Sequence, residues 1–173
     1  MPLDNVDKGQ IVDETPEMKA TREKLLSESP TPSFFKLRGQ MLKQGRTGEV
    51  VADTGNLYTT LKVYASGGEN GLHAHEDQDH QFIIMQGKAT FYGPRGEEKE
   101  IGQYEGIDIP AGCFYRFQSS GDVPLVLLRL GVRLGPKATH RYNVYGNPLH
   151  GQTEENGNEE TIPIEGKYWG AAE

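Results

Sequence analysis

Three of the five histidines of this chain, His73, His75 and His80, lie within eight residues of one another. Side chains alternate between the two faces of a strand, so His73 and His75 share one face and can approach the same ion. The apolar run after His80 predicts a second strand, with His80, Phe82 and Ile84 on one face. If the two strands are neighbours, His80 becomes a third ligand. Because neutral imidazole is a common ligand of first-row metals, the cluster predicts a metal site, and the alternative is a set of ordinary polar residues.

The spacing around these histidines resembles the first motif of the cupin superfamily. In that motif a Gly is followed by five residues, His-x-His, three or four residues, Glu, six residues and a second Gly. This chain matches it with Gly67, His73, His75 and Gly87, and His80 stands in the position of the glutamate. The resemblance implies a metal held by the three histidines.

The second cupin motif is matched in outline between Pro110 and Ser119. Pro110 and Gly112 reproduce its Pro-x-Gly, but Tyr115 stands where the family has a metal-binding histidine and Ser119 where it has an asparagine. The resemblance therefore places Tyr115 at the metal, as a fourth ligand or as a hydrogen-bond donor with a catalytic role. The alternative is an aromatic residue that fills the space of the missing ligand.

The departures from the motif have an electrostatic consequence. His80 in place of a glutamate raises the net charge of a divalent site by one unit, which favours an anionic substrate. A phenolate at Tyr115 would reverse this effect. Arg129 interrupts an apolar strand and is either an inward cation for a carboxylate or an ion-paired residue at the rim. The residues expected to line the substrate pocket are Phe82, Ile84, Tyr92, Phe117 and Arg129.

The resemblance implies metal-centred chemistry on a small molecule, and three alternatives follow. The favoured one is a mononuclear non-haem iron dioxygenase that acts on a small anionic organic substrate, with Fe(II) as cofactor and Zn, Mn or Ni as other candidates. The second is a metal-dependent lyase or isomerase in which Tyr115 moves a proton. The third is a ligand-binding cupin without turnover. The fold alone does not separate them.

Composition narrows the classes of partner. The net charge of -7 and the pI near 5.3 argue against nucleic acid or an anionic membrane as partner. The sequence contains neither a phosphate-binding glycine loop nor a dinucleotide fingerprint, and the single Cys113 precludes an internal disulfide framework. Because no apolar signal segment or long apolar run is found, we expect a cytoplasmic protein.

The histidines lie within residues 34–134, which contain short segments of alternating apolar and polar residues separated by turns. They predict an all-β fold, a jelly-roll or double-stranded β-helix barrel of the cupin kind. Residues 1–33 form an arm with one helix, capped by Thr15 and started by Pro16. Residues 135–173 form a C-terminal extension that packs on the barrel or on a partner. This extension holds His140 and His150, which we do not expect to be ligands. A homodimer is expected, because Ile83 and Met85 face outward.

Overall fold

The computed structural model describes residues 14–135, 141–149 and 160–172, without the side chains of residues 69 and 70. It divides after Phe34 into two compact units. The first contains α1 (Pro16–Glu28), which begins as the sequence predicts, because the Thr15 hydroxyl accepts a hydrogen bond from the backbone N–H of Met18 at 3.2 Å. No residue of α1 is buried. Among the described residues, no helix combines the length and apolar character needed to cross a membrane.

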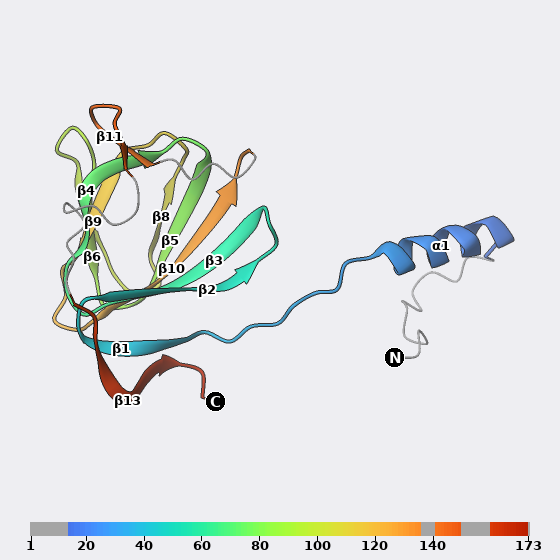
Figure 1. The fold of residues 1–173 in the computed structure, drawn as a ribbon, viewed down its shortest axis with the longest axis horizontal. Coiled ribbons are helices and arrows are strands. Elements are labelled where there is room, and N and C mark those ends of the chain that lie inside the picture. Colours follow the sequence, from blue (N-terminus) through green and yellow to red (C-terminus); the bar gives the residue numbers. More distant parts are fainter. Residues whose placement is uncertain (1–13, 136–140, 150–159, 173) are drawn as a thin grey trace. The chain divides into compact units, whose positions relative to one another are not determined.

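The second unit is built from antiparallel strands arranged in layers (Figure 1). One sheet has the order β2-β3-β10-β5-β8 and the other the order β12-β11-β4-β9-β6-β7, while β1 pairs with β13 in a separate ribbon. The strands are β1 (Arg38–Gln44), β2 (Arg46–Asp53), β3 (Leu57–Tyr64), β4 (Gly68–His75), β5 (Gln78–Gln86), β6 (Ala89–Tyr92), β7 (Glu98–Ile101), β8 (Gly106–Ile109), β9 (Tyr115–Ser119), β10 (Leu125–Arg133), β11 (Arg141–Asn143), β12 (Pro148–Leu149) and β13 (Ile162–Gly170). The predicted all-β barrel is confirmed.

The barrel core lies between the two large sheets. Alternate residues of β5 are buried, so Phe82 and Ile84 point inward while Gln81 and Ile83 point outward, as their spacing predicts. Aromatic residues from both sheets meet inside: Phe82 lies 5.6 Å from Phe117 between ring centroids. The inner cluster comprises Tyr64, Phe82, Ile84, Ala89, Phe91, Ile101, Ile109, Tyr115, Phe117, Leu125 and Leu127. Its burial removes a large apolar area from water, and this is the main stabilising contribution to the barrel.

A second apolar cluster lies on the outside of the five-stranded sheet, under the β1–β13 ribbon. Leu42 of β1 packs there with Leu61, Val63 and Val126, and Trp169 of β13 packs against the same cluster. The C-terminal strand β13 thus pairs with β1 of its own chain, from Arg38 opposite Gly170 to Gln44 opposite Ile162. Trp169 is therefore packed by its own chain, whereas Tyr168 of the same strand is exposed.

Candidate functional site

The predicted histidines and Tyr115 come together inside the barrel. His73, His75, His80 and Tyr115 are 1%, 7%, 3% and 3% exposed, so they are interior side chains and not residues of an open rim. Ring centroids of His73 and His75 lie 5.3 Å apart, those of His75 and His80 4.4 Å apart, and those of His73 and Tyr115 4.7 Å apart. The four side chains form one cluster, which we call the histidine cluster.

The strands that carry the histidines differ in one respect from the expected arrangement. β4 pairs with β9 and β11, and β5 pairs with β10 and β8, so the two are not hydrogen-bonded neighbours. The expectation of adjacent strands is wrong, because the turn at Glu76 and Asp77 carries the chain from one sheet to the other. His80 consequently meets His75 across the barrel interior.

Backbone contacts orient the first two histidines. His73 lies opposite Tyr115 in the β4–β9 register. The Nδ1 of His73 lies 2.8 Å from the carbonyl oxygen of Gly71; because a carbonyl only accepts, Nδ1 carries the proton and donates. Neutral His73 then has its lone pair on Nε2, the tautomer that a metal ligand needs. The carbonyl of His75 accepts a hydrogen bond from the backbone N–H of Gly112 at 2.7 Å, which ties β4 to the loop of the second motif.

His80 has a different environment, made of polar side chains from its own sheet. Its Nε2 lies 2.7 Å from Nη2 of Arg129 on β10, 3.1 Å from the hydroxyl of Tyr58 on β3 and 3.0 Å from Oε1 of Gln78. The Tyr58 hydroxyl donates to Oε1 of Gln78 at 2.7 Å. We call Tyr58, Gln78 and Arg129 the His80 niche.

Gly131 makes room for this niche. It lies opposite both His80 and Tyr58 in the sheet, and a Cβ atom at Gly131 would overlap the Tyr58 ring. Sequence reasoning found Arg129 but missed Tyr58, Gln78 and Gly131. Period-two alternation groups Tyr58 with Thr60 on one face of β3, yet only the pairing of β3 with β10 brings that face to His80.

The remaining predicted site residues separate into two groups. Phe82, Ile84 and Phe117 belong to the inner cluster and form an apolar wall. Tyr92 lies on the face of β6 opposite to Phe91, where the Arg116 guanidinium lies 4.0 Å above the Tyr92 ring centroid.

Asp79 is exposed and accepts a hydrogen bond from the backbone N–H of Ala111, so it holds the second-motif loop. Cys113 is exposed and not packed in the core. His140 and His150 lie outside the described residues.

The histidine cluster fits a divalent metal in part. Imidazole nitrogens suit iron, zinc and nickel, and the tautomer of His73 is the one required. His80 fits less well, because Arg129 already occupies its Nε2. Consistent with this, no three His, Cys, Asp or Glu side chains within residues 14–135, 141–149 and 160–172 are placed so that they could hold an ion. His73 and His75 are therefore the most suitable ligands, with Tyr115 beside His73.

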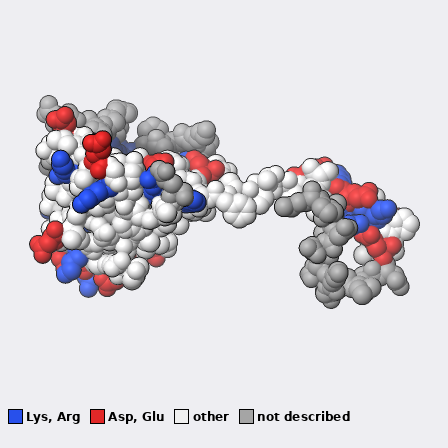
Figure 2. Space-filling view, turned by 90° about the horizontal axis from the view of Figure 1, so that it is seen from below, with Lys and Arg blue, Asp and Glu red and all other residues white. Residues whose placement is uncertain are grey.

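Cations face the barrel interior, although the chain as a whole is acidic. The register places Arg46, Lys62 and Arg129 on the inner face of the β2–β3–β10 part of the sheet, and all three are half-buried. Nη1 of Arg46 donates to the carbonyl of Gly68 on the opposite sheet at 3.0 Å. On the outer surface seen in Figure 2, by contrast, Lys and Arg are interspersed with Asp and Glu. Inward cations in a partly dehydrated interior attract an anionic ligand.

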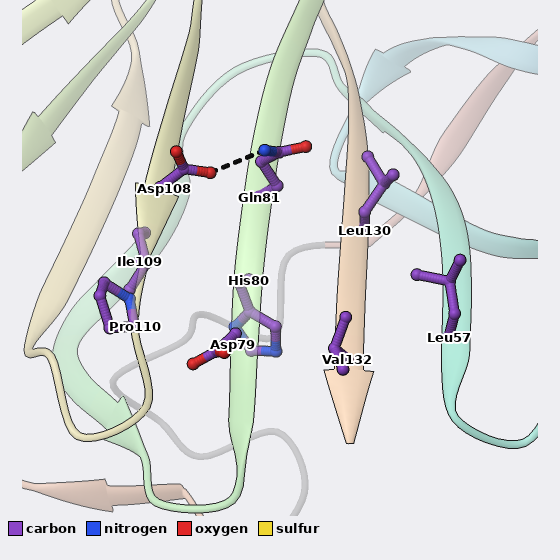
Figure 3. Close-up of a pocket in the computed structure, with 9 residues that line it drawn as sticks. All are labelled: Leu57, Asp79, His80, Gln81, Asp108, Ile109, Pro110, Leu130 and Val132. Atoms are coloured by element: carbon purple, nitrogen blue, oxygen red, sulfur yellow. Dashed lines mark hydrogen bonds between the residues drawn. The ribbon is translucent and has the colours of Figure 1, made fainter. Parts of the chain in front are cut away.

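A groove lies on the outer face of the same sheet, and His80 of the histidine cluster is among its lining residues (Figure 3). Its volume is about 330 Å³, and it is lined by Leu57, Asp79, His80, Gln81, Asp108, Ile109, Pro110, Leu130 and Val132. Leu57, Leu130 and Val132 supply its apolar side, and Gln81 donates to Asp108 at 2.7 Å on the other.

Comparison with protein-family models and with curated proteins gives no match. Solved structures do match. KdgF from Halomonas sp. is 20% identical with a TM-score of 0.50, over 60% of this chain and 96% of that one. The polyketide cyclase RemF from Streptomyces resistomycificus is 23% identical with a TM-score of 0.49, over 62% and 76% of the two chains. A sugar phosphate isomerase of the cupin superfamily from Silicibacter pomeroyi is 20% identical with a TM-score of 0.47, over 59% and 73%. At these identities the likeness concerns the fold alone, which is a double-stranded β-helix.

Proposed function

We propose that this chain is a cupin metalloenzyme that acts on a small anionic organic molecule inside the barrel. The observation that carries the proposal is the histidine cluster itself. Burying several imidazoles in place of apolar side chains costs free energy, because each ring loses hydration that hydrogen bonds must replace. A structural core has no need of such a cluster, whereas a metal or substrate site does.

The metal would be held by His73 and His75, with His80 and Tyr115 as further candidates. Fe(II) is the favoured ion, and Zn, Mn and Ni are alternatives with the same ligand preference. When bound, such an ion supplies Lewis acidity and, in the case of iron, redox chemistry with dioxygen. The residues of the chain orient the substrate, exclude water and handle protons.

The substrate would be oriented by charge and by the apolar wall. Arg46, Lys62 and Arg129 on the inner face favour a carboxylate or another anionic group, and Arg129 can bind it with two parallel N–H groups. Phe82 and Phe117, both fully buried, keep water from the reacting atoms. Tyr115 brings its phenol ring next to His73, where its hydroxyl can donate a proton or a hydrogen bond.

A dioxygenase is the first candidate reaction, because a centre of neutral histidines suits Fe(II) and an anionic substrate that chelates it. The second candidate is a lyase or isomerase, which the position of Tyr115 beside His73 favours, since that chemistry requires a group that moves a proton. Oxygen distinguishes the two reactions. The first consumes it and the second does not.

The test combines metal analysis with oxygen uptake. Elemental analysis of the purified protein should give about one transition-metal ion per chain. The protein loaded with Fe(II) is then incubated with a set of small carboxylic acids in an oxygen electrode. Uptake that depends on one acid supports the dioxygenase, and conversion of an acid without uptake supports the lyase or isomerase. Absence of stoichiometric metal under anaerobic reconstitution would contradict the proposal and leave a ligand-binding barrel.

We also propose that the chain forms a homodimer through the outer face of the five-stranded sheet. Leu57 and Val132, at 43% and 42% exposure, border the groove of Figure 3 beside the half-buried Leu130. Apolar side chains gathered on one face favour contact with a second copy, and a two-fold axis would bring the same face of each copy together. Ile83, which points outward on β5 and is half-buried, extends this face. Met85 points the same way but packs in the second apolar cluster of its own chain.

A further inference from the structure

We propose that Arg129 and a metal ion compete for the same nitrogen of His80, so that His80 joins a metal centre only when Arg129 leaves it. The inference rests on the proposed function and concerns how the site is regulated. It predicts two states of the site. In one, His73 and His75 are the histidine ligands; in the other, all three histidines are.

The first step is the chemistry of the contact between Arg129 and His80. A guanidinium carries only N–H donors and remains charged at any ordinary pH. Nη2 of Arg129 lies 2.7 Å from Nε2 of His80 and 3.4 Å from Nδ1 of the same ring, so this guanidinium nitrogen lies above the ring beside Nε2. A metal ion on Nε2 would therefore be in direct contact with a cationic group. The ion and Arg129 cannot occupy the space at Nε2 together.

The second step is the way the niche holds His80. Tyr58, Gln78 and Arg129 approach Nε2 from β3, β5 and β10 of one sheet, whereas His73 and His75 belong to β4 of the other sheet. Oε1 of Gln78 accepts from the Tyr58 hydroxyl at 2.7 Å and also lies 3.0 Å from Nε2 of His80, where an amide oxygen can only accept. This contact holds His80 toward its own sheet.

The third step is electrostatic. A divalent ion at His75 and His80 would lie close to the guanidinium of Arg129, and like charges repel strongly in a partly buried site. Metal binding at His80 thus requires that Arg129 withdraws. An anionic ligand that engages Arg129 favours this withdrawal, because it gives the guanidinium another partner.

Cobalt titration of matched arginine variants tests the competition. Wild-type protein, Arg129→Met and Arg133→Met are titrated with Co(II) by calorimetry, with the visible cobalt spectrum as a report on ligand number. Arg133 is the control because it lies on the same strand, 4.6 Å from the Tyr58 ring centroid, yet donates to Asp53 and not to His80. We expect Arg129→Met to bind Co(II) at least tenfold more tightly than wild type, and Arg133→Met to bind it as wild type does.

His80→Ala provides the second measurement, and its effect in the wild-type background does not depend on the folding of Arg129→Met. If Arg129 holds His80, this change alters the Co(II) affinity of the wild type by less than about threefold, and in Arg129→Met it abolishes the gain. A tenfold loss in the wild-type background, or equal affinities of wild type and Arg129→Met, would overturn the competition while leaving the proposed metalloenzyme intact. If neither wild type nor Arg129→Met binds Co(II), both proposals fail.

Discussion

At the residue scale, the three histidines differ in what their ring nitrogens contact. His73 donates to a backbone carbonyl, which fixes its tautomer and orients the ring for a ligand on Nε2. The Nε2 of His80 lies 2.7 Å from a guanidinium nitrogen of Arg129, a cation that keeps a metal ion away from this atom. Equal residue types at motif spacing therefore do not have equal roles, and single substitutions should reveal the difference.

His75→Ala should abolish stoichiometric metal binding and leave the barrel folded. The ring of His75 lies near those of both His73 and His80, so its loss removes both of these imidazole pairs. Metal content by elemental analysis and the far-ultraviolet circular dichroism spectrum check the two parts of this expectation. Glu76→Ala, a change at the exposed neighbour, serves as control. Full metal content in His75→Ala would refute a centre built on His73 and His75.

Tyr115→Phe separates the possible roles of this hydroxyl. If Tyr115 is a ligand of ferric iron, the aerobic iron-loaded protein has a visible charge-transfer band that the variant loses. If Tyr115 donates a proton, the variant keeps its metal and its turnover falls by roughly a hundredfold or more. Tyr92→Phe, on the outer face of β6, is the matched control. Unchanged spectrum, metal content and turnover would make Tyr115 a packing residue.

At the element scale, β10 connects the inside of the barrel with its outside. Arg129 and Gly131 face the His80 niche, while Leu130 and Val132 face the outer groove, because side chains alternate along the strand. The strand pairs with β3 and β5 along nearly its whole length. A change in its backbone should therefore affect the niche and the stability of the sheet together.

Gly131→Ala should disturb the niche and destabilise the barrel. The added methyl group would overlap the Tyr58 ring, so Tyr58 has to shift away from Gln78 and His80. Overpacking of this kind costs about 1–3 kcal/mol, measured as the change in the free energy of unfolding in urea. Gly48→Ala on β2 is the control, because its Cβ would make only an ordinary contact with Lys62 at 3.6 Å. Equal unfolding free energies of the two variants would contradict the expected role of Gly131.

At the scale of the whole molecule, the C-terminal strand and the outer groove bear on assembly in different ways. β13 packs on its own chain through Trp169, so this aromatic residue does not require a partner. The argument for a dimer then depends on the groove of Figure 3 and its apolar side. One surface substitution is enough to test it.

The wild type should have twice the monomer mass of 19.2 kDa in light scattering at micromolar concentration. Val132→Glu places a charge at the groove and should shift the mass to that of a monomer, because an unpaired charge buried in an apolar interface is costly. Val123→Glu, at a comparably exposed valine in the turn before β10, should remain dimeric. A monomeric wild type would refute the dimer.

The fold could be predicted largely from local patterns in the sequence. Period-two alternation gives the inward and outward faces of β5, and the motif glycines mark the turns: Gly87 and Gly112 both have a φ of 79°, a region that favours glycine. The burial of Phe82, Ile84 and Phe117 follows from the same alternation. These features depend on neighbouring residues alone, so the sequence is sufficient for them.

What the sequence by itself determined is therefore the all-β class and the faces of the strands, whereas the grouping of His73, His75, His80 and Tyr115 was implied by the resemblance to the cupin motifs. Only the tertiary structure decided which sheet each strand joins, and with it the contact between Arg129 and His80. That contact joins residues 49 positions apart. Its existence depends on the register of β10 against β3 and β5, which is set by packing over the whole sheet and leaves no local pattern along the chain.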